Sequence, residues 1–212
     1  MRKFILLLVL LSLPSAASAV ETILDQPHWS LELKEGSFAP ALDDWAHSYG
    51  KRSMPEYAAS LAYKFLQQLE LGVGVGSIRA KGQAFAGLHD ISAGSVTYEL
   101  HPVSVFAVFR GVVGEDQLLI PYVGGGWTRM NYIETIQDQG TVRGHANGYH
   151  IRGGLQLSLN ILDQRAGNRI YQDYGIFRTS VFIEAERCSA VVRSVSIDLG
   201  GTAYAGGLLF EF

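Results

Sequence analysis

The chain has 212 residues, of which 48% are hydrophobic and 17% charged, and its formal net charge is −3. So much apolar surface excludes a disordered chain, and the mildly acidic balance provides no electrostatic footprint for nucleic acid. A polytopic helical membrane protein is also excluded, because no window after the N-terminus approaches the roughly 20 apolar residues that a spanning helix needs.

The N-terminus is typical of a secretory signal peptide. Arg2 and Lys3 are followed by an apolar run from Phe4 to Leu13, and Ala17-Ser18-Ala19 forms a cleavage site of the A-x-A type. We therefore predict that residues 1–19 are removed and that residues 20–212 form a single domain. Cys188 is the only cysteine, so no internal disulfide can stabilise this exported domain.

The mature chain alternates between apolar and polar residues, which is typical of strands with two different faces. From Leu69 to Val75, for example, leucine and valine alternate with Glu70 and two glycines. The pattern predicts eight strands, over residues 28–37, 56–66, 68–80, 92–112, 117–133, 146–160, 175–189 and 197–212.

Two of these segments leave their orientation open. Pro102 cannot donate to a strand ladder, and we interpret it as a bulge inside one long strand. The apolar face then passes from Val96, Tyr98 and Leu100 before the bulge to Val103, Val105, Ala107 and Phe109 after it. In the 117–133 segment one face would carry Ile120, Tyr122, Met130 and Tyr132, and the other would carry Arg129 and Asn131.

The connections between the strands also alternate. Short turns follow the second and fourth strands, whereas polar loops of about 38–55, 81–91, 134–145 and 190–196 lie on the other side. Segment 161–174 lies on the short-turn side and resembles a small helix. This asymmetry is typical of barrels in the bacterial outer membrane, whose periplasmic turns are short.

A soluble, lipocalin-like barrel alternates as well, but its apolar face points inward. Aromatic residues near strand ends favour the opposite orientation, because such rings prefer the membrane interface. The polar face is nearly balanced in charge, as expected for a narrow interior in which ions must pair. We therefore predict a charge network in the lumen. Its acids are Glu32, Glu70, Glu99, Glu184, Glu186 and Glu211; its bases are Lys34, Lys64, Arg110, Arg129, Arg152 and Arg178, with His150 beside them.

The last strand closes on the apolar face with Tyr204, Leu208, Phe210 and Phe212. A terminal aromatic residue in this setting resembles the assembly signal of outer-membrane barrels. The stretch Pro121-Tyr122-Val123-Gly124-Gly125-Gly126 and the element Pro102-Val103-Ser104-Val105 resemble small barrels of the OmpA/OmpW type. The chain is most similar to a family of small outer-membrane barrels without an assigned biochemical role. The resemblance implies an all-β, eight-stranded antiparallel transmembrane up-and-down barrel with one short periplasmic helix.

An eight-stranded barrel is just wide enough for side chains to fill it. We therefore expect a closed, non-enzymatic barrel whose role is structural or is carried by its outer loops. The alternative is passage of small hydrophobic solutes, as in OmpW-like barrels. We expect no cofactor and no metal. The expected partners are outer-membrane lipid, lipopolysaccharide and, through the C-terminal strand, the barrel-assembly machinery; the expected state is a monomer.

Two groups of residues suggest chemical sites as alternatives to this interpretation. A lipid-modifying enzyme would need a serine and a histidine oriented by an acid, and His101 has Glu99 beside it on the predicted inner face with Ser104 nearby. The first loop contains Asp43, Asp44, Trp45, His47 and Tyr49. This loop could hold a metal, but a solvated loop whose tryptophan touches the membrane or the barrel rim is the stronger interpretation.

Overall fold

The computed structural model describes residues 26–41, 45, 49, 52–86, 91–114, 117–137, 140–192 and 197–212. The predicted signal peptide, residues 1–19, lies outside them. The elements are β1 (Trp29–Pro40), β2 (Met54–Lys64), β3 (Leu69–Ala86), β4 (Ile91–Arg110), β5 (Leu119–Ile136), β6 (Gly140–Ser158), α3 (Gln164–Tyr174), β7 (Arg178–Val192), β8 (Ile197–Asp198) and β9 (Gly201–Glu211).

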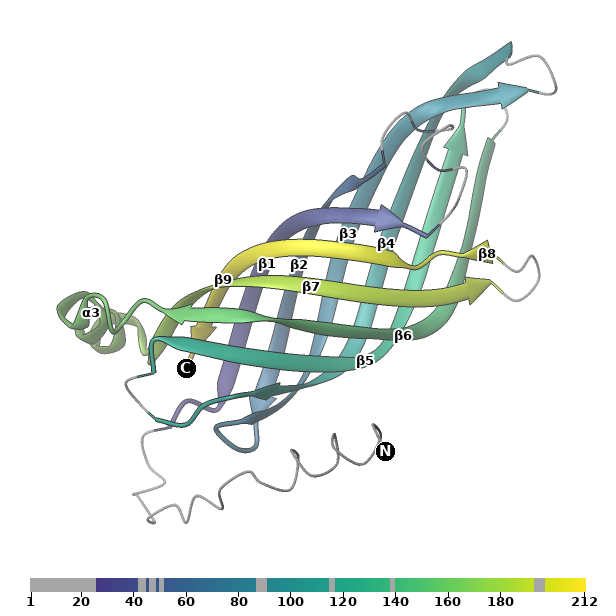
Figure 1. Ribbon diagram of the computed structural model, residues 1–212. Helices are drawn as coiled ribbons and strands as arrows, with labels where there is room; N and C mark the ends of the chain where they lie inside the picture. Colours follow the sequence, from purple (N-terminus) through teal and green to yellow (C-terminus); the bar gives the residue numbers. More distant parts are fainter. Residues whose placement is uncertain are drawn as a thin grey trace, which may run out of the picture.

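These strands form one closed antiparallel barrel (Figure 1). Consecutive strands pair from β1 to β7, and β9 pairs with both β7 and β1. The two-residue β8 pairs with β7 in the register that β9 continues, so β8 and β9 are one interrupted strand. The predicted eight-stranded transmembrane architecture is confirmed.

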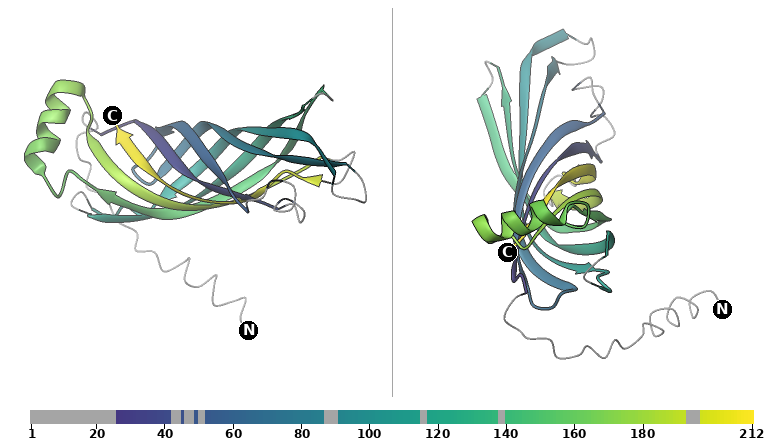
Figure 2. Two further views of the ribbon diagram at one scale, coloured as in Figure 1. Left: turned by 90° about the horizontal axis from the view of Figure 1, so that it is seen from above. Right: turned by 90° about the vertical axis from the view of Figure 1, so that its left-hand side faces the viewer.

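The barrel has a turn end and a loop end. The C-terminus and α3 lie at the turn end (Figure 2), where the backbone N–H of Trp29 donates to the Phe212 carbonyl at 2.7 Å. The β3–β4 and β5–β6 hairpins reach farther at the loop end than the rest of the wall (Figure 1). These four strands have 18 to 20 residues, whereas β1, β2 and β9 have 11 or 12.

Apolar side chains point outward and charged side chains point inward over the turn-end part of the wall. Leu71 is 48% exposed, whereas its neighbour Glu70 is 1% exposed. A water-soluble barrel of this size would bury the leucine and expose the glutamate. The outward apolar belt includes Leu33, Leu61, Val73, Val75, Val105, Val123, Ile151, Leu155, Ile183 and Leu208.

Aromatic side chains border this belt. Towards the loop end they include Tyr57, Trp127, Tyr149 and Tyr204, and at the turn end they include Trp29, Tyr63, Phe65 and Phe212. Trp127 pairs with Tyr149 across β5 and β6, and Trp29 packs edge-on against Tyr63 with ring centroids 5.2 Å apart. Two aromatic bands around an apolar wall are the arrangement of outer-membrane barrels.

Pro102 does not form a bulge, so that prediction is wrong. The register between β4 and β5 is constant from Val96 to Arg110. On the other side, the pairs Val75–Val103 and Ile78–Leu100 share one register, although no pair joins the strands between them. Proline therefore interrupts the ladder without shifting it, because it removes a hydrogen bond but adds no residue.

A constant register places Val96, Tyr98 and Leu100 inside the barrel, where they are at most 7% exposed. The predicted phase of β5 is also reversed. Ile120, Tyr122 and Met130 are buried, and Arg129 lies on the outer side. Both errors have one cause: the interior also contains apolar side chains, in the loop-end cluster and, at the turn end, at Ile120 and Tyr122, so an apolar residue does not by itself mark the lipid face.

The strands at the loop end are longer than predicted. The segments 81–91 and 134–145 were predicted as loops, but β3 extends to Ala86, β5 extends to Ile136 and β6 begins at Gly140. Polar and apolar residues do not follow a two-residue period in these segments of the sequence. Alternation therefore fades there, although backbone pairing continues.

The predicted helix on the short-turn side is present as α3. The Asp163 side chain caps its first turn by accepting from the backbone N–H of Ala166, and Gly175 ends it with a left-handed φ of 69°. No helix in the described part of the chain is both long enough and apolar enough to cross a membrane.

The triple glycine in β5 permits close approach of β4. A Cβ atom on Gly126 would overlap the backbone carbonyl of Val105. We expect Gly126→Ala to lower the free energy of unfolding by about 1–3 kcal/mol, because the backbones would have to separate. Urea unfolding followed by tryptophan fluorescence checks this. In the control Gly114→Ala, the added methyl group meets nothing within 4 Å, and an equal loss there would contradict the packing account.

Candidate functional site

A chain of ion pairs crosses the turn-end half of the interior. Each member lies within 4 Å of the next, and acids alternate strictly with bases. In order along the chain, the residues are Glu186, Lys34, Glu184, Arg152, Glu32, Arg110, Glu70, Lys64, Glu211 and Arg178.

Arg110 lies at the middle of this chain and is 1% exposed. Its guanidinium contacts Glu70 at 2.7 Å and Glu32 at 2.6 Å. It also donates to Gln156 at 2.9 Å. Arg152 continues the chain from Glu32, at 2.9 Å. Because the bonds reach residues of β1, β3 and β6 from β4, Arg110 ties opposite sides of the barrel together.

The strict alternation of acids and bases in this chain of ion pairs is a consequence of its burial. An isolated ion costs several kcal/mol to bury unless it is paired and hydrogen-bonded. Strict alternation gives each interior member of the chain two opposite charges. Smaller polar groups complete the shell: Ser30 donates to Glu70 at 2.9 Å, Ser60 to Glu32 at 2.9 Å and Tyr122 to Glu184 at 3.1 Å.

The structure brings together most of the residues predicted for the lumen. Those inside the barrel are Glu32, Lys34, Lys64, Glu70, Arg110, His150, Arg152, Arg178, Glu184, Glu186 and Glu211. Glu99 and Arg129 are not among them, so their predicted positions are wrong. Glu99 pairs with Arg79 on the outer side at 3.1 Å, and the Nε atom of Arg129 donates to Asn131 on the same side at 3.2 Å.

Glu56 is an interior acid that the sequence analysis missed. It is 5% exposed and lines a cavity of about 40 Å³ with Lys34, His150, Arg152 and Glu186. The alternation of β2 contained the signal, because Glu56 falls on the same face as Lys64. The cavity is large enough for two or three water molecules and lies between the ion-pair chain and the loop-end interior.

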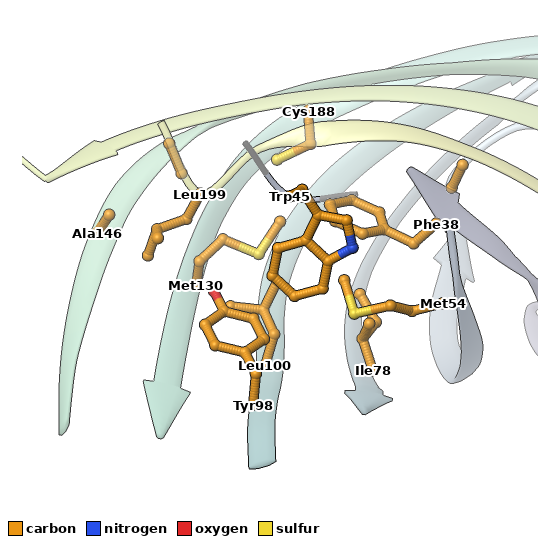
Figure 3. Close-up of a cluster of buried hydrophobic side chains, with 12 residues drawn as sticks. Phe38, Trp45, Met54, Ile78, Tyr98, Leu100, Met130, Ala146, Cys188 and Leu199 are labelled. Carbon is orange, nitrogen blue, oxygen red and sulfur yellow. The ribbon is translucent and has the colours of Figure 1, made fainter. Parts of the chain in front are cut away.

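The loop-end half of the interior is apolar. Trp45 is 5% exposed and lies among Phe38, Met54, Leu100 and Met130 (Figure 3). Trp45 therefore belongs to the core of the barrel and is not a ring that touches the membrane or the rim, as the preferred interpretation of this loop had it. The whole cluster comprises Phe38, Trp45, Met54, Ile78, Tyr98, Leu100, Met130, Ala146, Cys188, Ala190, Leu199 and Ala203.

Tyr49 fixes the first loop over this cluster. Its ring stacks on Trp45 with centroids 3.8 Å apart, and its hydroxyl donates to Glu134 at 3.3 Å. Burial and the Glu134 carboxylate both raise the pKa of Tyr49, so the phenol remains a donor at physiological pH. Asp43, Asp44 and His47 lie outside the described residues. Within those residues, no group of three potential metal-ligating side chains occurs.

The structure does not bring together the serine, histidine and acid that a lipid-modifying enzyme would need. His101 and Glu99 lie on the outer side of β4, with 4.0 Å between the Nε2 and Oε2 atoms. Ser104 lines the interior cavity instead. A histidine and a serine on opposite faces of one strand cannot form a nucleophile–base pair, so this candidate site is not assembled.

The proposed assembly-signal residues lie on the outer side of the wall, in β9 and at Phe212, which follows it. Tyr204 is 66% exposed, Leu208 41% and Phe212 43%, and Phe210 pairs with Leu31 of β1. Their recognition by the assembly machinery stays a prediction.

No protein-family pattern matches the chain, and no curated protein matches its sequence. Solved structures do match. Neisserial surface protein A is 10% identical, with a TM-score of 0.53 over 87% of this chain and 96% of that protein. The fold is that of small outer-membrane β-barrels. The outer membrane protein OprG from Pseudomonas aeruginosa is 12% identical, with a TM-score of 0.54 over 88% of this chain and 97% of that protein.

Proposed function

We propose that the protein is an integral, non-conducting barrel of the bacterial outer membrane, with a structural role or a role carried by its loops. Barrels of this class place short turns and both termini in the periplasm, so the turn end with α3 faces the periplasm. The loop end then faces outward.

One observation carries the proposal: the alternating chain of ten charges spans the interior from β7 to β3 and back. A permeating ion would have to displace side chains such as Arg110 and Glu70, both 1% exposed, that are each other's partners. The apolar cluster around Trp45 fills the next level. The ion-pair chain and the apolar cluster therefore fill successive parts of the barrel along its axis, and both oppose conduction.

Planar bilayers test this directly. We expect the purified protein to produce no reproducible conductance steps in molar potassium chloride, while a porin reconstituted from the same detergent produces them. Steps of constant size from the pure protein would overturn the proposal. Heat-modifiable gel mobility confirms that the inserted protein is folded, so that silence is not mistaken for denaturation.

A second candidate function is entry of small hydrophobic solutes. The specific observation in its favour is the apolar loop-end interior, which lies next to the interrupted pairing of Gly76 and Ser77 with His101 and Pro102. The ion-pair chain below would stop a solute from continuing along the axis, so exit would have to occur sideways through the wall.

Tryptophan quenching tests this candidate. The variant Trp29→Phe/Trp127→Phe retains Trp45, which is 5% exposed inside the barrel. Its counterpart Trp29→Phe/Trp45→Phe retains Trp127, which is 46% exposed to lipid. If solutes enter, a brominated short alkane quenches both tryptophans; if the interior is closed, it quenches Trp127 alone.

A further inference from the structure

The outer face of β3 to β6 carries an excess of positive charge towards the loop end. Four cationic side chains define this basic face: Arg79, Lys81, Arg129 and Arg143. Arg79 is 59% exposed, and Lys81 and Arg143 are exposed as well. Glu99 is the one carboxylate among the described side chains that point outward here. The whole chain has a net charge of −3, so this face has the opposite sign to the protein.

The strand register places the basic face next to the aromatic border. Arg129 follows Trp127 by two residues on β5, and therefore points to the same side one step closer to the loop end. Trp127 pairs with Val105 of β4 and with Tyr149 of β6, whereas Arg129 pairs with Val103 and Asn147. The cation thus lies immediately beyond the ring that marks the membrane interface.

The other members lie on neighbouring strands at and beyond this level. Arg79 pairs with Glu99, and Glu99 pairs with Ile133, which in turn pairs with Arg143. One row across four strands therefore carries two arginines and a single acid. His101, Asn131 and His145 occupy the row between this one and Arg129, and they add further hydrogen-bonding groups.

The position of the basic face beside the membrane interface and its positive charge together indicate the kind of ligand. Towards the turn end from it, Val105 and Ile151 are 53% and 61% exposed, and they present an apolar wall to acyl chains. A molecule that lies on both surfaces needs acyl chains and an anionic headgroup. Arginine is suited to this headgroup, since its planar guanidinium binds phosphate through paired hydrogen bonds.

We propose that the basic face binds the phosphates of an outer-leaflet glycolipid, the lipid A part of lipopolysaccharide, whose acyl chains lie against the wall below. The inference rests on the membrane orientation proposed above, but not on the absence of conduction. Arg79 and Arg129 are the principal phosphate ligands, because they flank β4 closest to the aromatic border.

The experiment compares two forms of one lipid. The full barrel in detergent is titrated with bis-phosphorylated lipid A and with dephosphorylated lipid A, and native mass spectrometry counts the bound lipids. We expect about tenfold tighter binding of the phosphorylated form, which corresponds to one charge-assisted hydrogen bond. In Arg79→Gln/Arg129→Gln this preference should disappear.

The matched control is Arg165→Gln/Arg169→Gln on α3, which removes the same charge from exposed residues at the turn end. It should keep the preference of the parent. Equal affinity of the parent for both lipids, or an unchanged preference in Arg79→Gln/Arg129→Gln, would overturn the proposal. So would full competition by a soluble sulfated sugar at equal anion concentration, because the ligand would then be a polyanion without acyl chains. Heat-modifiable mobility verifies that each variant is folded.

Discussion

Replacing Arg110 by leucine is expected to lower the free energy of unfolding by about 3–5 kcal/mol. The guanidinium of Arg110 forms ion pairs with both Glu32 and Glu70, with nitrogen–oxygen distances of 2.6 and 2.7 Å. Both carboxylates are at most 4% exposed, so neither can turn to water once the cation is removed. Urea unfolding in lipid vesicles, followed by gel mobility, measures the shift in midpoint.

Arg178→Leu is the matched control for this variant. Arg178 ends the ion-pair chain, has 16% of its side chain exposed and contacts only Glu211 within it, at 3.6 Å. We expect a smaller loss of about 1 kcal/mol, because Glu211 keeps Lys64 as its other partner. If both variants unfolded at the midpoint of the parent, the ion-pair chain would not be what stabilises the interior.

Replacing Ile183 by arginine is expected to cost about 2–4 kcal/mol, the penalty for a cation near the middle of a bilayer. Ile183 is 65% exposed and pairs with Leu155 on one side and Gly206 on the other. In a soluble barrel the same substitution on an exposed residue would be nearly neutral. The measurement is the folded fraction recovered in lipid vesicles against urea concentration.

Depth along the same strand distinguishes a membrane effect from a packing effect. Val191 also points outward from β7, is 44% exposed and lies near the loop end. Val191→Arg should cost at most about 1 kcal/mol, because the side chain can reach water. Similar losses at residues 183 and 191 would contradict the placement of the apolar belt in lipid.

The alternation of the sequence was sufficient to predict the barrel and much of its turn-end interior. Glu70 between two leucines, or Arg152 between Ile151 and Gly153, can be buried only if the opposite faces are in lipid. Hydrophobic patterning fixes the register of a strand strongly where the two faces differ. At the turn end they do differ, and the predicted faces of β1, β2 and β7 agree with the structure.

The loop-end half could not be predicted in this way, because there the interior is apolar as well. Tyr98 and Leu100 are as apolar as lipid-facing residues, but they pack against Trp45 and Met130 inside. A rule that assigns every apolar residue to lipid required a bulge at Pro102 to reconcile the two halves of β4. It also placed Glu99 inside and reversed β5. Trp45 belongs to the apolar cluster but lies between β1 and β2, so the periodicity of the strands could not predict that its side chain is buried.

The ion pairs of the interior join segments that are remote along the chain. Lys34 meets Glu186, Arg152 meets Glu32, and Lys64 meets Glu211, over separations of 152, 120 and 147 residues. A partly inserted sheet would leave Glu32, Lys34 and Lys64 without these counter-ions, since the partners lie on β6, β7 and β9. Partly assembled intermediates therefore have a high free energy, because they contain unpaired charges. Pairing of β1 with β9 closes the barrel and removes this penalty. Insertion into the bilayer should consequently proceed as a single concerted event, and severing the polypeptide between β6 and β7 should slow it far more than it weakens the finished barrel.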